Sequence, residues 1–289
     1  MDASERGAQR RWWWIAVPAA LMVTATSAPA SADPPGAAPP VSRKVSKDSE
    51  RRAHEVLRGM AQKLSSARSV TVTARRELDE ATARALGTPR KSILVASVLR
   101  PSRVRVDTST LDEKPVRSFY YDGSKATVVD HTLGVHASGD MTGDIDAMAD
   151  AVEDRYGFSL PLLEFLANDP AAAMADDVQE ARYEGIKMMD GKPCHQLALS
   201  GNDDRARLWV AKDDELPRRL VATLKNGDAI TDLEIVFTQW NLSADVSEDR
   251  FAFTPPSGYY RVEMVKGKEP NPAAPATPSE PGAPAPKQP

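Results

Sequence analysis

The chain has 289 residues, of which 41 are acidic and 37 basic, so its net charge at pH 7 is −4. This mildly acidic balance argues against nucleic acid as a partner, since proteins that bind nucleic acid carry clustered basic side chains. The one cysteine, Cys194, excludes an intramolecular disulfide, so the fold must be stabilised by an apolar core.

The first residues predict an export signal. Arg10 and Arg11 precede an apolar run over residues 12–23, and Ala30-Ser31-Ala32 fits an A-x-A cleavage site. The run is shorter than the ~20 residues that a membrane-spanning helix needs. We therefore expect residues 1–32 to be a signal peptide that sends the protein to the periplasm, with secretion as the alternative. After cleavage the protein would not be integral to the membrane; an uncleaved membrane anchor is the competing interpretation.

Composition divides the rest of the chain into three parts. Residues 33–45 are rich in Pro and Ala and are typical of a linker, and residues 266–289 have a similar composition and predict a disordered tail. Residues 46–265 remain as one domain, long enough to bury a core of its own.

The domain is predicted to begin with a helix that Ser46 caps. Apolar residues follow at the spacing of one helix face; they are Ala53, Val56, Leu57, Met60 and Leu64. Such a helix would lie across a sheet or act as a plug.

Alternating apolar residues and turn-forming clusters predict six strands in the first half of the domain. They span residues 69–78, 91–100, 103–107, 116–121, 126–130 and 131–137. One helical turn is expected in residues 79–90, and Asp122-Gly123 predicts a hairpin turn.

The pattern then changes to the period of helices. A first helix is expected to start near Thr142 or Asp144 and to end at Gly157, a second covers residues 160–166, and a third opens at Pro170. Helices inserted in the middle of a run of strands would cover one face of the sheet.

Strands resume at residues 178–188 and continue through residues 191–240, where turn-forming clusters separate four alternating runs. Residues 259–265 predict a final edge strand. These elements indicate an α+β fold, with a curved antiparallel sheet of about ten or eleven strands covered by the helices inserted mid-chain.

The order of short motifs along the domain carries a family resemblance. The motifs are Tyr121-Asp122-Gly123, Glu153-Asp154-Arg155-Tyr156-Gly157, Leu160-Pro161-Leu162, Asp169-Pro170, Asp190-Gly191, Pro193-Cys194, Leu208-Trp209, Pro217-Arg218, Leu220-Val221, Trp240-Asn241-Leu242 and Phe253-Thr254-Pro255-Pro256. In this order they resemble the predicted periplasmic proteins of domain-of-unknown-function family 2092, which are similar in fold to the LolA/LolB lipoprotein carriers. The resemblance implies a LolA-like incomplete β-barrel closed by helices, with an apolar cavity that holds acyl chains.

The strand patterns predict which residues would line such a cavity, because side chains alternate between the two faces of a strand. The cavity candidates are Leu94, Val104, Phe119, Tyr121, Leu197, Leu199, Leu208, Val210, Leu220, Leu233, Ile235 and Phe237. The inserted helices would supply a lid, with Tyr156, Leu162, Leu163 and Phe165 as its residues.

Two hypotheses about function follow. In the leading one, the protein is a non-enzymatic periplasmic binding or carrier-like protein that shelters a lipid, an acyl chain or a lipoprotein. In the alternative, it is an envelope scaffold that recognises another envelope protein and has a filled core. Whether the interior of the sheet is hollow or filled separates the two.

Signals for catalysis or for a metal are weak in this sequence. No G-x-S-x-G motif is present, and the four histidines lack the spacing of a zinc site. Cys194 reads as a small buried apolar residue, and the acidic residues between positions 140 and 154 lack the spacing of a calcium-binding loop. We therefore expect no catalytic residue, no metal and no cofactor.

Two further groups of residues invite an interpretation. Five arginines predict a basic strip on the outer face of neighbouring strands, either as solvated strand edges or as a contact for anionic headgroups; they are Arg75, Arg76, Arg100, Arg103 and Arg105. Trp209 points to the face opposite Leu208 and Val210, which suggests that it packs under the inserted helices.

Overall fold

The computed structural model describes residues 46–175, 178–201, 203–226 and 229–264. The predicted signal peptide (residues 1–32), linker (residues 33–45) and tail (residues 266–289) lie outside the described residues.

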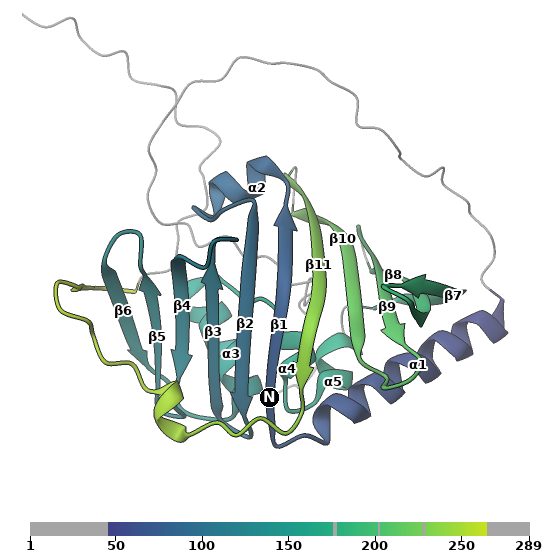
Figure 1. Ribbon diagram of the computed structural model, residues 1–289, viewed down its shortest axis with the longest axis horizontal. Coiled ribbons are helices and arrows are strands. Elements are labelled where there is room, and N and C mark those ends of the chain that lie inside the picture. Colours follow the sequence, from purple (N-terminus) through teal and green to yellow (C-terminus); the bar gives the residue numbers. More distant parts are fainter. Residues whose placement is uncertain (1–45, 176–177, 202, 227–228, 265–289) are drawn as a thin grey trace, which may run out of the picture.

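One curved sheet forms the body of the domain (Figure 1). Its twelve strands are β1 (Ser69–Leu78), β2 (Lys91–Leu99), β3 (Arg103–Ser109), β4 (Pro115–Tyr121), β5 (Lys125–Asp130), β6 (Val135–Asp140), β7 (Glu180–Met189), β8 (Lys192–Gly201), β9 (Asp204–Ala211), β10 (Pro217–Asn226), β11 (Ala229–Asn241) and β12 (Tyr260–Val262). Their order across the sheet is β12-β6-β5-β4-β3-β2-β1-β11-β10-β9-β8-β7. Neighbours pair antiparallel, except that β12 runs parallel to β6. Within the described residues, β12 and β7 are the two ends of this order, so the barrel is incomplete.

Helices lie on one face of this sheet, which is therefore its covered, concave face (Figure 1). They are α1 (Lys47–Ser65), α3 (Ile145–Tyr156), α4 (Leu163–Leu166) and α5 (Pro170–Ala175). The short helix α2 (Glu80–Ala85) lies beyond the ends of β1 and β2 instead, and the 3₁₀ helix η1 (Glu248–Phe251) packs on β3. The helices α3, α4 and α5 follow one another behind the sheet, and α1 packs against β7, α4 and α5. This arrangement confirms the α+β fold predicted from the sequence, with slightly more strands than expected.

Local signals explain where the long helices begin and end. The Ser46 hydroxyl accepts a hydrogen bond from the backbone N–H of Ser49 at 3.2 Å and so caps α1. The Asp144 side chain caps α3 in the same way, and α3 ends at Gly157, whose φ of 71° belongs to the left-handed region that glycine adopts readily.

The predicted meander of residues 191–240 is confirmed as β8 to β11. A tight hairpin leads into it, because Asp190 and Gly191 both have positive φ angles, 48° and 78°, the combination that suits a two-residue hairpin turn. The register then places Leu197 opposite Leu208, and Leu208 opposite Leu220. These leucines therefore share one face of the sheet, as the alternation predicts.

Among the predicted boundaries, those of the sixth strand and of the second inserted helix are wrong. The sixth strand covers Val135–Asp140 rather than residues 131–137, because the Asp130 side chain accepts the backbone N–H groups of Thr132 and Leu133, both at 3.0 Å, and holds a turn there. The second inserted helix begins at Leu163 rather than at residue 160, because Leu162 has a left-handed φ of 69° that a helix cannot contain.

The C-terminal segment crosses the uncovered face of the sheet, which we call the outer face, from β11 to β6 (Figure 1). Along this path Glu248 pairs with Arg103, and the Phe253 ring packs 5.1 Å from the ring of His136. The segment ends as the edge strand β12, shorter than the predicted residues 259–265.

Candidate functional site

The candidate site is the concave face of the sheet. All twelve predicted cavity candidates, from Leu94 on β2 to Phe237 on β11, are between 0% and 5% exposed and belong to one continuous apolar cluster. They come from both halves of the chain, which meet where β1 pairs with β11. The structure therefore brings together the residues that the sequence analysis assigned to one interior.

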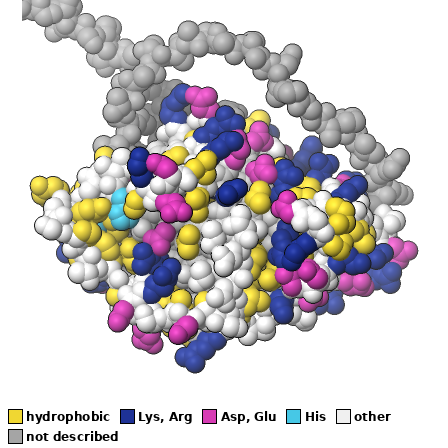
Figure 2. All heavy atoms as spheres, in the orientation of Figure 1, with side chains coloured by type: hydrophobic (Ala, Val, Ile, Leu, Met, Phe, Trp, Pro, Cys, Tyr) yellow, Lys and Arg dark blue, Asp and Glu magenta, His cyan; other side chains and the backbone are white. Residues whose placement is uncertain are grey.

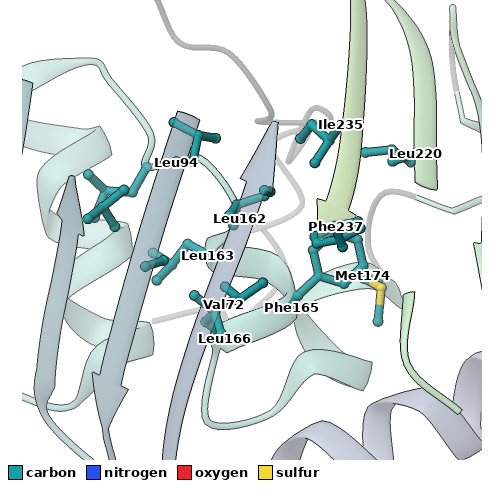
Figure 3. Packing of buried hydrophobic residues seen from close by; sticks show 14 of the residues in the cluster. Val72, Leu94, Leu162, Leu163, Phe165, Leu166, Met174, Leu220, Ile235 and Phe237 are labelled. Atoms are coloured by element: carbon teal, nitrogen blue, oxygen red, sulfur yellow. The ribbon is translucent and has the colours of Figure 1, made fainter. Parts of the chain in front are cut away.

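The lid candidates on α4 point into this same interior. Leu162 is fully buried, and Phe165 meets Phe237 edge to face with ring centroids 5.2 Å apart. Figure 3 shows Leu162, Leu163 and Phe165 directed toward the sheet residues Leu94, Ile235 and Phe237. The concave face is thus occupied by side chains of the inserted helices.

The remaining lid candidate, Tyr156, has a different place. It is only partly buried, stacks on Phe158 at 6.5 Å, and lies with its hydroxyl against Gly139 of β6, where a side chain would collide with it. Sequence reasoning missed two residues that do fill the interior, Leu166 and Met174. The available signal was their apolar character and, for Leu166, its place in the same apolar run as Leu163 and Phe165.

Arg100 fastens α4 to the end of the sheet. Its guanidinium donates hydrogen bonds to the carbonyl oxygens of Ala67 at 2.6 Å, Leu166 at 3.2 Å and Ala167 at 2.9 Å. These carbonyls belong to the end of α4 and to the segment before β1. The prediction that Arg100 belongs to a basic strip on the outer face is therefore wrong, because the carbonyl oxygens at the end of α4 occupy its donors.

The other arginines of the predicted basic strip do not form a strip either. Arg103 pairs with Glu248, and Arg105 donates to Asp107 at 2.8 Å. Figure 2 shows Lys and Arg side chains interspersed with Asp and Glu on the outer face. Arg75 is exposed on the outer face, whereas its neighbour Arg76 points to the concave face and is 9% exposed.

A cleft of about 350 Å³ lies among the inserted helices. Its lining residues are Asp146, Ala149, Asp150, Val152, Glu153, Ser159, Leu160, Leu163, Glu164, Ala167, Asp169, Ala172 and Ala173. Leu163 is the only cavity or lid candidate among them, so this cleft lies in the helical layer and is not the predicted cavity.

The Asp146 carboxylate joins α3 to the segment before α5 by accepting the backbone N–H of Asn168 at 2.8 Å. Burial raises the pKa of this carboxyl.

One serine and one histidine meet on the outer face. The Ser118 hydroxyl donates to Asp107 at 2.7 Å and lies 2.9 Å from His131 Nε2, while His131 Nδ1 lies 3.0 Å from the Tyr259 hydroxyl. In a hydrolase triad the carboxylate orients the histidine, which accepts the serine proton. Here the Asp107 carboxylate accepts the hydrogen bond of the serine hydroxyl, and the Tyr259 hydroxyl contacts the other ring nitrogen of His131. The arrangement anchors the C-terminal segment to β4.

Cys194 and Trp209 form a second, smaller apolar cluster with Ala211. Burial raises the pKa of the Cys194 thiol, which suits a packed residue rather than a nucleophile. The guanidinium of Arg219 lies 5.2 Å from the Trp209 ring. The expectation that Trp209 packs under the inserted helices is wrong. Those helices cover the strand face of Leu208 and Val210, and Trp209 lies on the opposite face.

Within the described residues, no group of three or more His, Cys, Asp or Glu side chains is placed to hold a metal ion. In the same part of the chain, no helix combines the length and apolar character needed to cross a membrane.

Comparisons with known proteins give one family and several distant structural likenesses. The model of a family described as "Predicted periplasmic protein (DUF2092)" matches residues 53–265. No curated protein is similar enough to count as a relative. This description agrees with the periplasmic location and with the family resemblance drawn from the motifs.

Three solved structures illustrate the structural likeness. An uncharacterized conserved protein from Thermus thermophilus is 13% identical, with 73% of this chain and 99% of that chain covered and a TM-score of 0.43. The LolA superfamily protein NE2245 from Nitrosomonas europaea is 10% identical, with 70% and 97% covered and a TM-score of 0.32. MucB, in the MucA/MucB complex of Pseudomonas aeruginosa, is 18% identical, with 70% and 61% covered and a TM-score of 0.38. All three likenesses are distant, and none indicates what this chain binds.

Proposed function

Because this chain belongs to the DUF2092 family of predicted periplasmic proteins, we propose that it is a non-catalytic periplasmic binding protein. Its ligand is a lipid or an acyl chain, which it shelters on the concave face of the sheet. The helix α4 then acts as a plug that leaves the interior when the ligand enters.

The observation that carries this proposal is that a short helix fills part of one continuous apolar interior. The helix α4 has only four residues, and Leu162 before it holds a left-handed φ of 69°, a conformation that costs about 1–2 kcal/mol for a residue other than glycine. Departure of α4 would release this strain and uncover the buried surfaces of Leu94, Ile235 and Phe237. An entering acyl chain would replace the lost contacts at about 0.8 kcal/mol per buried methylene.

Lipid analysis of the protein purified from the periplasm tests this function. Native mass spectrometry and solvent extraction should reveal a co-purifying lipid in the wild-type protein. Leu233→Glu places a charge in the interior and should abolish retention of that lipid. Thr223→Glu, which lies at an exposed position of β10, is the matched control and should retain it. A folded Leu233→Glu variant that keeps the lipid would contradict the assignment of the interior.

A second candidate function is an envelope scaffold that recognises another envelope protein. The observation that favours it is the packing of Phe165 against Phe237, since these rings occupy the space that a ligand would need. A lipid-free protein that also fails to take up added lipid would support the scaffold over the carrier.

A further inference from the structure

Arg76 places a charged side chain on the concave face, which is mostly apolar. It lies on β1 between Ala74 and Leu78, with Ser92 opposite it on β2 and Ile235 opposite it on β11. Because residues two apart share a strand face, Arg76 points to the same side as Ala74 and Leu78, which are 0% and 1% exposed. The arginine itself is 9% exposed.

The hydrogen bonds of Arg76 leave its charge uncompensated. Its Nε donates to the Ser92 hydroxyl and its Nη2 donates to the Thr88 hydroxyl, each at 3.2 Å. A guanidinium carries five N–H donors, and within the described residues no carboxylate pairs with this one. The charge that acts on it is Arg117, another cation, which is itself paired with Asp130 at 3.1 Å. Burial, together with Arg117, lowers the pKa of Arg76 to about 10.

A buried cation without a counter-charge is costly, and proteins usually pair such a group or use it to bind an anion. Arginine suits carboxylate and phosphate oxygens in particular, because its planar fork matches their geometry. The three N–H groups of Arg76 that the two hydroxyls do not occupy are therefore suited to an oxyanion.

The strand register continues from Arg76 into the apolar interior. Ile235 on β11 stands opposite Arg76, Leu220 on β10 opposite Ile235, Leu208 on β9 opposite Leu220, and Leu197 on β8 opposite Leu208. At about 4.8 Å between neighbouring strands, these four steps measure about 19 Å along the sheet. One row across the concave face thus carries a cation at one end and only aliphatic side chains beyond it.

We propose that this row is the binding track of an anionic amphiphile, with Arg76 holding its carboxylate or phosphate headgroup and Ile235, Leu220, Leu208 and Leu197 contacting its acyl chain. The inference rests on the proposed function and names the class of its ligand. In the absence of ligand, the hydroxyls of Ser92 and Thr88 hold the guanidinium in place.

Binding of three probes to the purified, delipidated protein tests the proposal by isothermal titration calorimetry. The probes are dodecyl phosphate, the neutral detergent dodecyl maltoside, and inorganic phosphate. Dodecyl phosphate should bind about tenfold to a hundredfold more tightly than dodecyl maltoside, the range that one charge-assisted contact gives. Inorganic phosphate should bind more weakly than dodecyl phosphate, because it lacks the chain that Ile235 and the leucines contact.

Two variants identify the residue responsible. Arg76→Met removes the charge but keeps the aliphatic stem, and should abolish the preference for dodecyl phosphate over dodecyl maltoside. Arg75→Met is the matched control, since Arg75 is the adjacent residue on the outer face, and it should keep the preference. If Arg76 only ties down the loop that contains Thr88, Arg76→Met would lower stability but leave the preference unchanged, which overturns the proposal.

If Arg76→Met fails to fold, the binding measurements on the wild-type protein still test the proposal. Equal binding of dodecyl phosphate and dodecyl maltoside would overturn the headgroup site while the sheltered-lipid function stands. Binding of inorganic phosphate as tight as that of dodecyl phosphate would overturn the amphiphile track. Failure of both amphiphiles to bind would overturn the proposed function as well.

Discussion

Phe237 and Trp240 stack with their ring centroids 5.4 Å apart, although residues three apart in a regular strand point to opposite faces. A β-bulge in β11 accounts for this contact. In the pairing with β1, Ala74 stands opposite Phe237 and Thr73 stands opposite Gln239, so Thr238 has no partner of its own. The extra residue turns Trp240 back toward the interior.

Deleting Thr238 should therefore remove the bulge but keep Trp240 on the same face as Phe237. In the variant these two residues are two positions apart, the spacing of residues that share a strand face, and Gln239 and Trp240 keep Thr73 and Val72 as their partners. The stack with Phe237 and the hydrogen bond from the indole N–H to the Pro217 carbonyl, which measures 2.9 Å, should remain. We expect the free energy of unfolding to fall by only about 1 kcal/mol, for the lost hydrogen bond of Thr238. Urea unfolding measures this loss, and an unchanged tryptophan emission would report that the ring stays in place.

The control for this deletion is Thr238→Val, which keeps the bulge. It removes only the hydrogen bond from the Thr238 hydroxyl to the Thr73 carbonyl at 3.0 Å, so it should cost about 1 kcal/mol. Equal losses in the two variants are therefore expected, and a much larger loss with a red-shifted emission in the deletion would contradict this account of the bulge.

Phe165→Ala separates a plug from an ordinary core residue. Phe165 is 1% exposed, and its truncation should lower the free energy of unfolding by about 3–5 kcal/mol. If α4 occupies the acyl site, the cavity left behind enlarges that site, and dodecyl phosphate should restore much of the lost thermal stability. Differential scanning calorimetry with and without the amphiphile measures the recovery.

Phe251→Ala is the matched control for this experiment. Phe251 is also fully buried, but it lies on η1, which packs against the outer face of β3. Its truncation should be as costly, and the amphiphile should not reverse the loss. Equal recovery in both variants would point to nonspecific stabilisation by detergent.

The interior could be read from the sequence because strand alternation is a local pattern. Leu233, Ile235 and Phe237 needed only their spacing to be placed on one face, and the register with β1 confirms them. The same rule places Arg76 on the concave face, since Ala74 and Leu78 lie two residues before and after it. Placing Arg75 and Arg76 in one outer strip was wrong because adjacent strand residues cannot share a face.

Other features depend on contacts between distant segments, so the local pattern does not contain them. The hydrogen bonds of Arg100 to α4 join residues more than sixty positions apart. The bulge at Thr238 is decided by the pairing of β11 with β1. Whether α4 fills the concave face depends in turn on the strand order, which alternation alone does not determine.

Arg100→Gln should loosen the plug without unfolding the sheet. The variant loses most of the hydrogen bonds that hold the Leu166 and Ala167 carbonyls. We expect amide hydrogen exchange in residues 163–169 to accelerate, and amphiphile uptake and release both to become faster. Arg103→Gln, which loses only the contact with Glu248 on the outer face, should leave both rates unchanged. Unaltered exchange in Arg100→Gln would show that packing alone holds α4.

His131 should make stability depend on pH near neutrality. Burial lowers the pKa of His131, against the opposing effects of Asp107 and Asp130. The unfolded chain takes up the proton near its ordinary pKa of about 6.5, whereas the folded protein takes it up only at a lower pH. Between these two values the unfolded chain binds more protons, so stability rises with pH and falls as the pH drops below about 6.5.

Urea unfolding midpoints between pH 5 and pH 8 measure this dependence. His131→Gln should flatten the decline on the acid side, because a glutamine takes up no proton there. Burial also lowers the pKa of His195, so the single variant should keep part of the slope and the double variant His131→Gln/His195→Gln should lose more of it. His54→Gln, at an exposed position of α1, serves as the control and should keep the wild-type slope. A full wild-type slope in His131→Gln would contradict the role given to this histidine, and with it the idea that its neutral ring holds Tyr259 and the C-terminal segment against β4.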